Sequence, residues 1–157
     1  MRRFCGAVAA ATALVTFVAA PAVAETPART PAAKKGKPVT VQLYEFGVKA
    51  KPKFVAAGKV TFTAKNIGTM RHEMVLVKTT EGAALPTAPD GSVDEAAIPE
   101  SDKLGDIGSL KPKKSGKLTV RLAPGDYELF CNLTTKDSQG ITYVHYAQGM
   151  HQAFQAG

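Results

Sequence analysis

Apolar and polar residues alternate along several stretches of the chain, with the period expected of half-buried β-strands. The alternation covers residues 39–44, 59–65, 71–78 and 116–122. Within the third stretch, His72, Met74 and Leu76 fall on one face of the predicted strand. Turn-forming residues separate these stretches, and long amphipathic helical patterns are lacking. The pattern therefore predicts an all-β protein of about seven or eight short strands, arranged as an antiparallel sandwich.

The segment 81–115 breaks the alternation. Four prolines and four glycines punctuate it, and no apolar period runs through it. A long excursion between two strands is more common in a sandwich than a second domain of this size. We therefore expect a long irregular loop insertion within one folded domain.

The N-terminus has the pattern of an export signal. Arg2 and Arg3 precede an apolar run without charges, and 21–24 ends in the small residues that signal peptidase recognises. The run is short for a bilayer span, which needs about 20 residues, so we expect no stable membrane insertion. Cys5 lacks the preceding apolar residues that a lipid anchor needs. This interpretation makes 1–24 a cleavable signal peptide and the mature protein periplasmic or secreted.

Residues 25–37 are rich in proline, alanine, threonine and lysine, without apolar periodicity. Such a segment cannot bury enough apolar surface to offset its chain entropy, which predicts a disordered tether. The folded domain is then 38–157. The whole chain has a formal charge of +7, which suits either an acidic protein partner or a merely solvated basic surface. We find no motif for nucleic acid, and an exported protein rarely meets it.

Removal of the signal would leave Cys131 without an internal disulfide partner. An unpaired cysteine in an oxidising compartment pairs with another chain, stays buried and inert, or binds metal. His145 and Met150 follow it, and His72 lies upstream. Each of these residues alone is more often core or surface than ligand. Together, a thiolate, two imidazoles and a thioether are the donors that select copper.

These motifs resemble the cupredoxins, the blue copper proteins that include plastocyanin, azurin and pseudoazurin. The strand that ends in Tyr127-Glu-Leu-Phe-Cys131 resembles the family's approach to its cysteine. The sequence His145-Tyr-Ala-Gln-Gly-Met150 resembles its ligand loop, and Arg71-His72-Glu73-Met74 resembles the upstream histidine that starts a strand. The resemblance implies a Greek-key β-sandwich of cupredoxin type over 39–154. It also implies one copper ion, with His72, Cys131 and His145 in a trigonal plane and Met150 as the axial ligand.

Three features depart from the family pattern. The gap between Cys131 and His145 is long, as if 134–144 were inserted, and this leaves His151 open as an alternative ligand. Glu73 stands where many relatives have an asparagine that ties the ligand loops together. The 81–115 insertion could cover or extend the site's end of the sandwich.

The resemblance implies a carrier of single electrons, which would pass to a redox partner through an exposed edge of His145. A copper carrier or metallochaperone is one alternative, favoured by a long ligand loop. A cupredoxin-fold interaction domain with a vestigial site is another. We do not expect an enzyme, because Cys131 and His145 lack a third residue to orient them as nucleophile and base.

Overall fold

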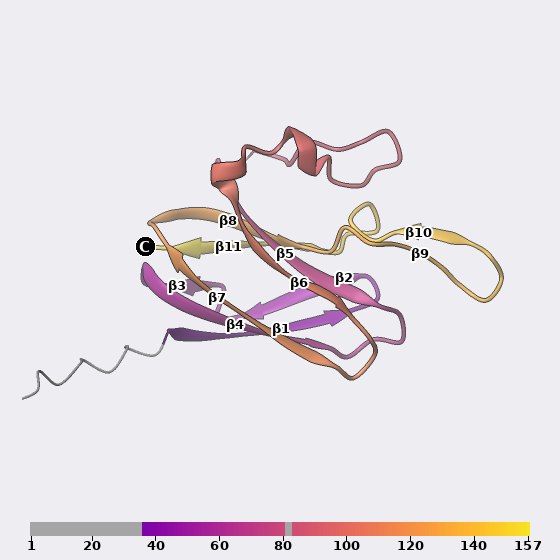
Figure 1. Cartoon of the computed structure of the whole chain (residues 1–157), viewed down its shortest axis with the longest axis horizontal. Helices are drawn as coiled ribbons and strands as arrows, with labels where there is room; N and C mark the ends of the chain where they lie inside the picture. Colours follow the sequence, from indigo (N-terminus) through magenta and orange to yellow (C-terminus); the bar gives the residue numbers. More distant parts are fainter. Residues whose placement is uncertain (1–35, 81–82) are drawn as a thin grey trace, which may run out of the picture. The chain divides into compact units, whose positions relative to one another are not determined.

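Two β-sheets face each other in the computed structural model, which describes residues 36–80 and 83–157 (Figure 1). One sheet has the strand order β2-β1-β4-β7 and the other has the order β3-β11-β8-β5-β6. A separate hairpin pairs β9 with β10. The described elements, which include two short 3-10 helices, are β1 (Lys37–Tyr44), β2 (Gly47–Lys51), β3 (Phe54–Val55), β4 (Gly58–Asn66), β5 (His72–Thr79), η1 (Glu95–Ala97), η2 (Glu100–Asp102), β6 (Lys103–Leu110), β7 (Ser115–Leu122), β8 (Gly125–Phe130), β9 (Thr134–Lys136), β10 (Thr142–Val144) and β11 (His151–Ala156).

The alternation seen in the sequence becomes the inner faces of the two sheets. β1 and β4 lie parallel, while β4 and β7 pair antiparallel, so the sandwich is mixed rather than purely antiparallel. Phe62 of β4 and Phe154 of β11 meet between the sheets in an edge-to-face contact at 5.2 Å. Each large apolar side chain that is buried in this way contributes about 1.5–3 kcal/mol to folding. The all-β sandwich prediction is confirmed.

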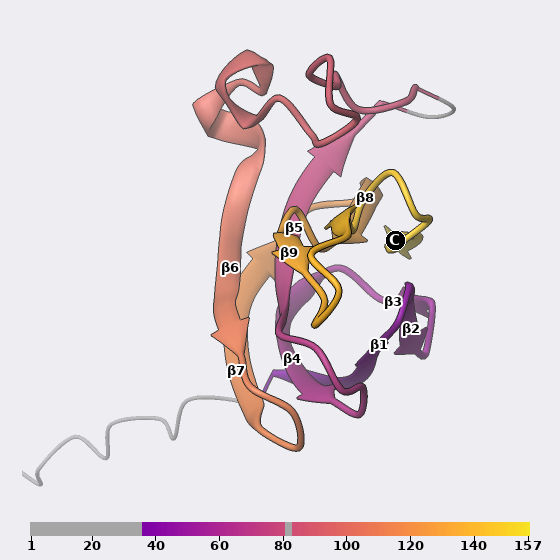
Figure 2. The same ribbon diagram turned by 90° about the vertical axis from the view of Figure 1, so that its right-hand side faces the viewer.

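The segment 81–115 contains more order than the sequence predicts. Its last part forms β6, which pairs antiparallel with β5, and β7 begins at Ser115. The remainder crosses the outer face of β5 and β8 and seals a second apolar cluster there (Figure 2). This cluster consists of Val77, Leu85, Val93, Ile98 and Phe130. The expectation of a wholly irregular loop was wrong because β6 is an edge strand with two glycines and little apolar alternation.

The predicted signal peptide, 1–24, and most of the predicted tether lie outside the described residues. The last residue of that tether, Lys37, is the first residue of β1. Among the residues that the structure describes, no helix is long and apolar enough to cross a membrane.

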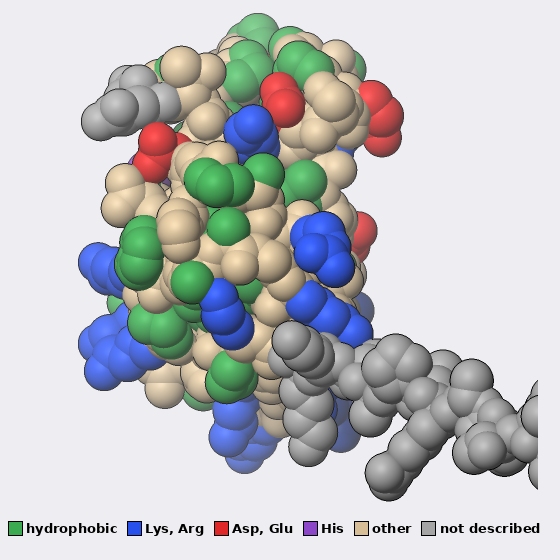
Figure 3. Space-filling view, turned by 90° about the vertical axis from the view of Figure 1, so that its left-hand side faces the viewer, with side chains coloured by type: hydrophobic (Ala, Val, Ile, Leu, Met, Phe, Trp, Pro, Cys, Tyr) green, Lys and Arg blue, Asp and Glu red, His purple; other side chains and the backbone are tan. Residues whose placement is uncertain are grey.

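Charge is distributed unevenly over the surface. Residues 90–106, which comprise part of the connection from β5 to β6 and the start of β6, include six acidic residues and one lysine. Lysine and arginine predominate over the sandwich itself, as Figure 3 shows for the face opposite the β9–β10 hairpin. Among the described residues, the excess of positive charge therefore lies on the sandwich, and the connection between β5 and β6 is acidic.

Candidate metal centre

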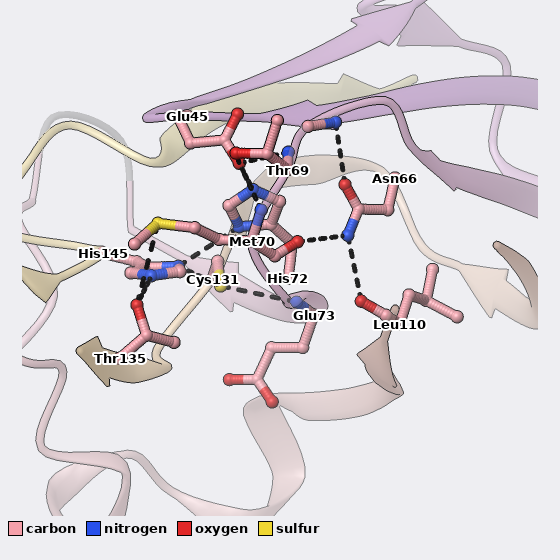
Figure 4. Close-up of polar contacts among 11 residues, drawn as sticks. Glu45, Asn66, Thr69, Met70, His72, Glu73, Leu110, Cys131, Thr135 and His145 are labelled. Atoms are coloured by element: carbon pink, nitrogen blue, oxygen red, sulfur yellow. Dashed lines mark hydrogen bonds and ion pairs between the residues drawn. The ribbon is translucent and has the colours of Figure 1, made fainter. Parts of the chain in front are cut away.

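Two histidines and one cysteine meet in the interior of the domain. The Nδ1 atoms of His72 and His145 are 3.2 Å apart, and the Sγ atom of Cys131 lies 3.3 Å from His145 Nδ1. One donor atom from each residue falls within 4.8 Å of the others. All three side chains are fully buried. Three of the four predicted ligands therefore converge at one point (Figure 4).

Strand ends bring these side chains together. His72 opens β5 with its side chain inward, on the same face as Met74 and Leu76, as the alternation predicts. Cys131 follows the last residue of β8, and His145 follows the last residue of β10. Rigid strands thus deliver each group to the same end of the sandwich.

Asn66 fixes the loop that leads into β5. It is fully buried, and its Nδ2 donates to the carbonyl oxygens of Met70, at 2.8 Å, and Leu110, at 2.9 Å. Its Oδ1 accepts from the backbone N–H of Gly68 at 2.9 Å. These bonds tie the end of β4 and the end of β6 to the loop before β5. They therefore help to fix the position of His72, the first residue of β5.

The fourth predicted ligand, Met150, lies directly beside this group along the backbone. Its carbonyl accepts from the N–H of Cys131 at 3.0 Å, and its own N–H donates to the carbonyl of His145 at 3.1 Å. The turn closes at Gly149, whose φ of 93° favours glycine. Met150 is fully buried and belongs to the same apolar cluster as Cys131. Its role as an axial ligand stays a prediction.

The environment of His72 favours a neutral ring. Burial lowers the pKa of His72, and the nearby carboxylate of Glu45 partly offsets this effect. Burial raises the pKa of Glu45, but hydrogen bonds from the backbone, chiefly from Met70 and Thr69, outweigh it and bring that pKa to about 2. Glu45 is therefore ionised at neutral pH.

His145 is more enclosed than the resemblance implied. Its Nε2 lies 2.8 Å from the Thr135 hydroxyl in β9, and the ring of Phe46 contacts it edge-on at 5.5 Å. The expectation of an exposed His145 edge was wrong, because the segment 134–144 folds as the β9–β10 hairpin and covers it. Burial, reinforced by the proximity of His72, lowers the pKa of His145 to about 4.

Cys131 is held as a thiol in the metal-free protein. Burial raises its pKa to about 11, although the backbone amides of Glu73 and Leu133 act in the opposite direction. The Glu73 N–H donates to the sulfur at 3.4 Å. The Glu73 carboxylate also accepts from the N–H of Asn132 at 3.0 Å. Glu73 thus ties β5 to the segment after Cys131.

His151 lies outside this group. It begins β11, its side chain is 46% exposed, and its Nδ1 lies 3.0 Å from the Glu128 carboxylate. Its ring packs at 4.8 Å from that of Tyr146. The structure therefore places His145, and not His151, beside Cys131 and His72.

The distances suit a small cation. Two ring nitrogens that bind one ion at about 2.0 Å are separated by about 3.3–3.5 Å for tetrahedral or trigonal angles. The two Nδ1 atoms, 3.2 Å apart, are close to this separation. One cysteine sulfur and two imidazoles form a donor set that suits copper well.

Comparisons with known proteins show the fold. No protein-family model matches the chain, and no curated protein matches it significantly. Among solved structures, auracyanin from Roseiflexus castenholzii aligns with a TM-score of 0.53 and 22% identity, over 78% of this chain and 98% of that one. Auracyanin B aligns with a TM-score of 0.52 and 23% identity, over 86% and 93%. Rusticyanin from Thiobacillus ferrooxidans aligns with a TM-score of 0.50 and 16% identity, over 78% and 79%. The chain has the cupredoxin fold.

Two residues whose polar side-chain atoms contact the histidines were not anticipated from the sequence. Glu45 lies in the turn between β1 and β2, and nothing in the local pattern points to a role. Thr135 lies in the apparent insertion, and the unusual length of the gap before His145 is the only signal for it. A gap of that length suggests a hairpin. A hairpin that covers His145 brings one of its side chains into contact with that ring, and here the side chain is Thr135.

Proposed function

We propose that the protein binds one copper ion through His72, Cys131, His145 and Met150, and that it carries single electrons between redox partners. The observation that carries the proposal is the convergence of two histidine Nδ1 atoms and one cysteine sulfur, all fully buried, at the strand ends of a cupredoxin fold. Copper bound there supplies a one-electron couple, Cu(I)/Cu(II). The strands hold the donors in one arrangement, so little rearrangement accompanies a change of charge.

The contacts favour an electron carrier over a copper carrier. A metallochaperone needs ligands that move apart to hand over metal, and the sequence suggested a long loop that could do so. The β9–β10 hairpin is instead tied internally, because Asp137 accepts hydrogen bonds from the backbone N–H groups of Gln139 and Ile141. A vestigial site would have lost ligand residues or their placement. Here His72, Cys131 and His145 are all present with their donor atoms close together, which argues against it.

Electrons would leave through the hairpin that covers His145. The route would run from His145 Nε2 through the hydroxyl of Thr135, which lies 2.8 Å away in β9. Exposed apolar side chains flank this end of the molecule, with Ile67 at 48% and Ile141 at 50% exposure. Exposed basic residues accompany them in the same strands and turns, namely Lys65, Arg71, Lys113, Lys114 and Lys136. We therefore propose a protein partner with an apolar contact area and an acidic rim.

We also propose that the protein is exported and works in the periplasm or outside the cell. The signal pattern of residues 1–24 supports this. An unpaired cysteine that is protected as a buried metal ligand is also compatible with an oxidising compartment.

An absorption spectrum tests the metal proposal. The copper-loaded protein should show an intense thiolate-to-Cu(II) band that bleaches on reduction and returns on oxidation. Cys131→Ser and His145→Gln should abolish the band, and His151→Gln should keep it as the matched control. A colourless protein that binds Cu(I) and yields it readily to a chelator would favour the copper carrier, and no copper uptake would favour the interaction domain.

A further inference from the structure

Glu45 projects from the turn between β1 and β2 toward the strand that carries His72. Its Oε1 accepts hydrogen bonds from the backbone N–H groups of Thr69 and Met70, both at 2.6 Å. The same oxygen lies 3.3 Å from His72 Nε2. Figure 4 shows these three contacts meeting at the Glu45 carboxylate. The carboxylate and Cys131 lie on opposite sides of the His72 ring.

We propose that Glu45 is a positioning residue for the metal centre, which fixes the tautomer and the orientation of His72 and places a negative charge behind that ligand. This inference rests on the proposed function. It adds a second negative charge to the site, beyond that of the bound Cys131 thiolate.

The hydrogen-bond pattern determines the tautomer. Oε1 already accepts from two N–H groups, so it acts as an acceptor and His72 Nε2 must carry the hydrogen. A neutral imidazole has one N–H only, so the lone pair lies on Nδ1. That atom is the one that faces His145 Nδ1 at 3.2 Å. Glu45 therefore presents His72 to the site in the form that can bind a metal.

The charge has a second effect. A carboxylate that accepts a hydrogen bond from a ligand imidazole makes that imidazole a stronger donor. A stronger donor and a nearby negative charge favour Cu(II) over Cu(I), because the ion with the larger charge gains more. Glu45 would thus oppose the thioether of Met150, which favours Cu(I). The side chain is 26% exposed, so solvent weakens this effect but does not remove it.

A simpler role for Glu45 is to tie the β1–β2 turn to the loop before β5. Glu45→Gln separates the two roles, because a glutamine oxygen still accepts from Thr69 and Met70 but carries no charge. The matched control is Glu128→Gln, which removes the carboxylate that pairs with His151 outside the site, at 3.0 Å. Urea unfolding of the metal-free variants checks that both remain folded.

Three measurements on the full-length protein test the inference. In the metal-free wild type, ¹⁵N NMR of the histidine side chains should show His72 with hydrogen on Nε2, and Glu45→Ala, which removes the acceptor, should give a mixture of tautomers. Zinc affinity, measured by chelator competition, should fall 10–100-fold in Glu45→Gln and stay unchanged in Glu128→Gln. The copper preference should move toward Cu(I) by roughly tenfold, which corresponds to about 59 mV in the reduction potential.

The results separate this inference from the proposed function. A wild type that binds metal, with Glu45→Gln equal to it in zinc affinity and in potential and Glu45→Ala equal to it in the His72 tautomer, would overturn the role of Glu45 alone. A wild-type His72 with its hydrogen on Nδ1 would do the same. A wild type that takes up no copper would overturn the proposed function, while the NMR measurement would still decide the part that Glu45 plays in setting the tautomer.

Discussion

Acidification should destabilise the metal-free protein through His145. In the folded state its pKa is about 4, against an ordinary value of 6.5, because the ring is buried beside His72. The unfolded chain therefore binds a proton between pH 6.5 and pH 4 that the folded chain does not. The free energy of unfolding rises with pH in this window, and stability is lost as the pH falls.

The size of the effect follows from the two pKa values. Between pH 7 and pH 4.5, the contribution of His145 to the free energy of unfolding falls by about 2 kcal/mol. Urea unfolding of the metal-free protein at these two pH values measures the total loss. His145→Gln should lose less stability over the same interval, by about that amount, because glutamine does not titrate.

A matched variant isolates the buried ring from the rest of the protein. His151→Gln replaces a histidine outside the site and should still show the loss of about 2 kcal/mol that His145→Gln lacks. Equal losses in the wild type and in His145→Gln would refute the reasoning, because the buried ring would then make no contribution to the pH dependence.

The remaining predictions concern the thiol, the hairpin and the sandwich. Copper binding at pH 7 should release about one proton per chain, because the pKa of Cys131 is about 11 and the thiol must ionise to bind. Calorimetry in buffers of different ionisation enthalpy measures the number of protons released. No release would contradict a bound thiolate. Thr135→Val should weaken zinc binding about tenfold by removing the hydroxyl beside His145 Nε2, whereas Thr134→Val, on the exposed side of β9, should leave it unchanged. Tyr127→Phe should lower the free energy of unfolding by about 1 kcal/mol, because the buried Tyr127 hydroxyl donates to the Ala123 carbonyl at 2.7 Å; an unchanged urea midpoint would show that this bond contributes nothing.

The sandwich could be predicted because each core strand alternates in sequence. β1, β4 and β5 show the pattern plainly, since one face of each lies between the sheets. The alternation did not predict β2 or β6, which lie at sheet edges: β2 has only five residues, and β6 has two glycines and little apolar alternation. The strand period is visible only where several consecutive residues alternate, so a short strand or one interrupted by glycines is missed.

The ligand types could be predicted and their surroundings could not. A cysteine, two histidines and a methionine in a particular order are visible in the sequence, because their donor chemistry is rare in combination. Glu45 meets His72 across 27 residues of sequence, through a turn whose direction only the fold determines. The burial of His145 likewise depends on how the β9–β10 hairpin folds back, which residue order does not reveal.

Electrochemistry of the copper-loaded protein is the most direct test of the account. We predict a reversible wave of one electron per chain, with a potential that changes when Glu45 or Met150 is replaced and a wave that disappears in Cys131→Ser. A wave that persists unchanged in Cys131→Ser, or no wave from protein shown to hold one copper ion, would contradict a thiolate-bound copper centre that carries electrons.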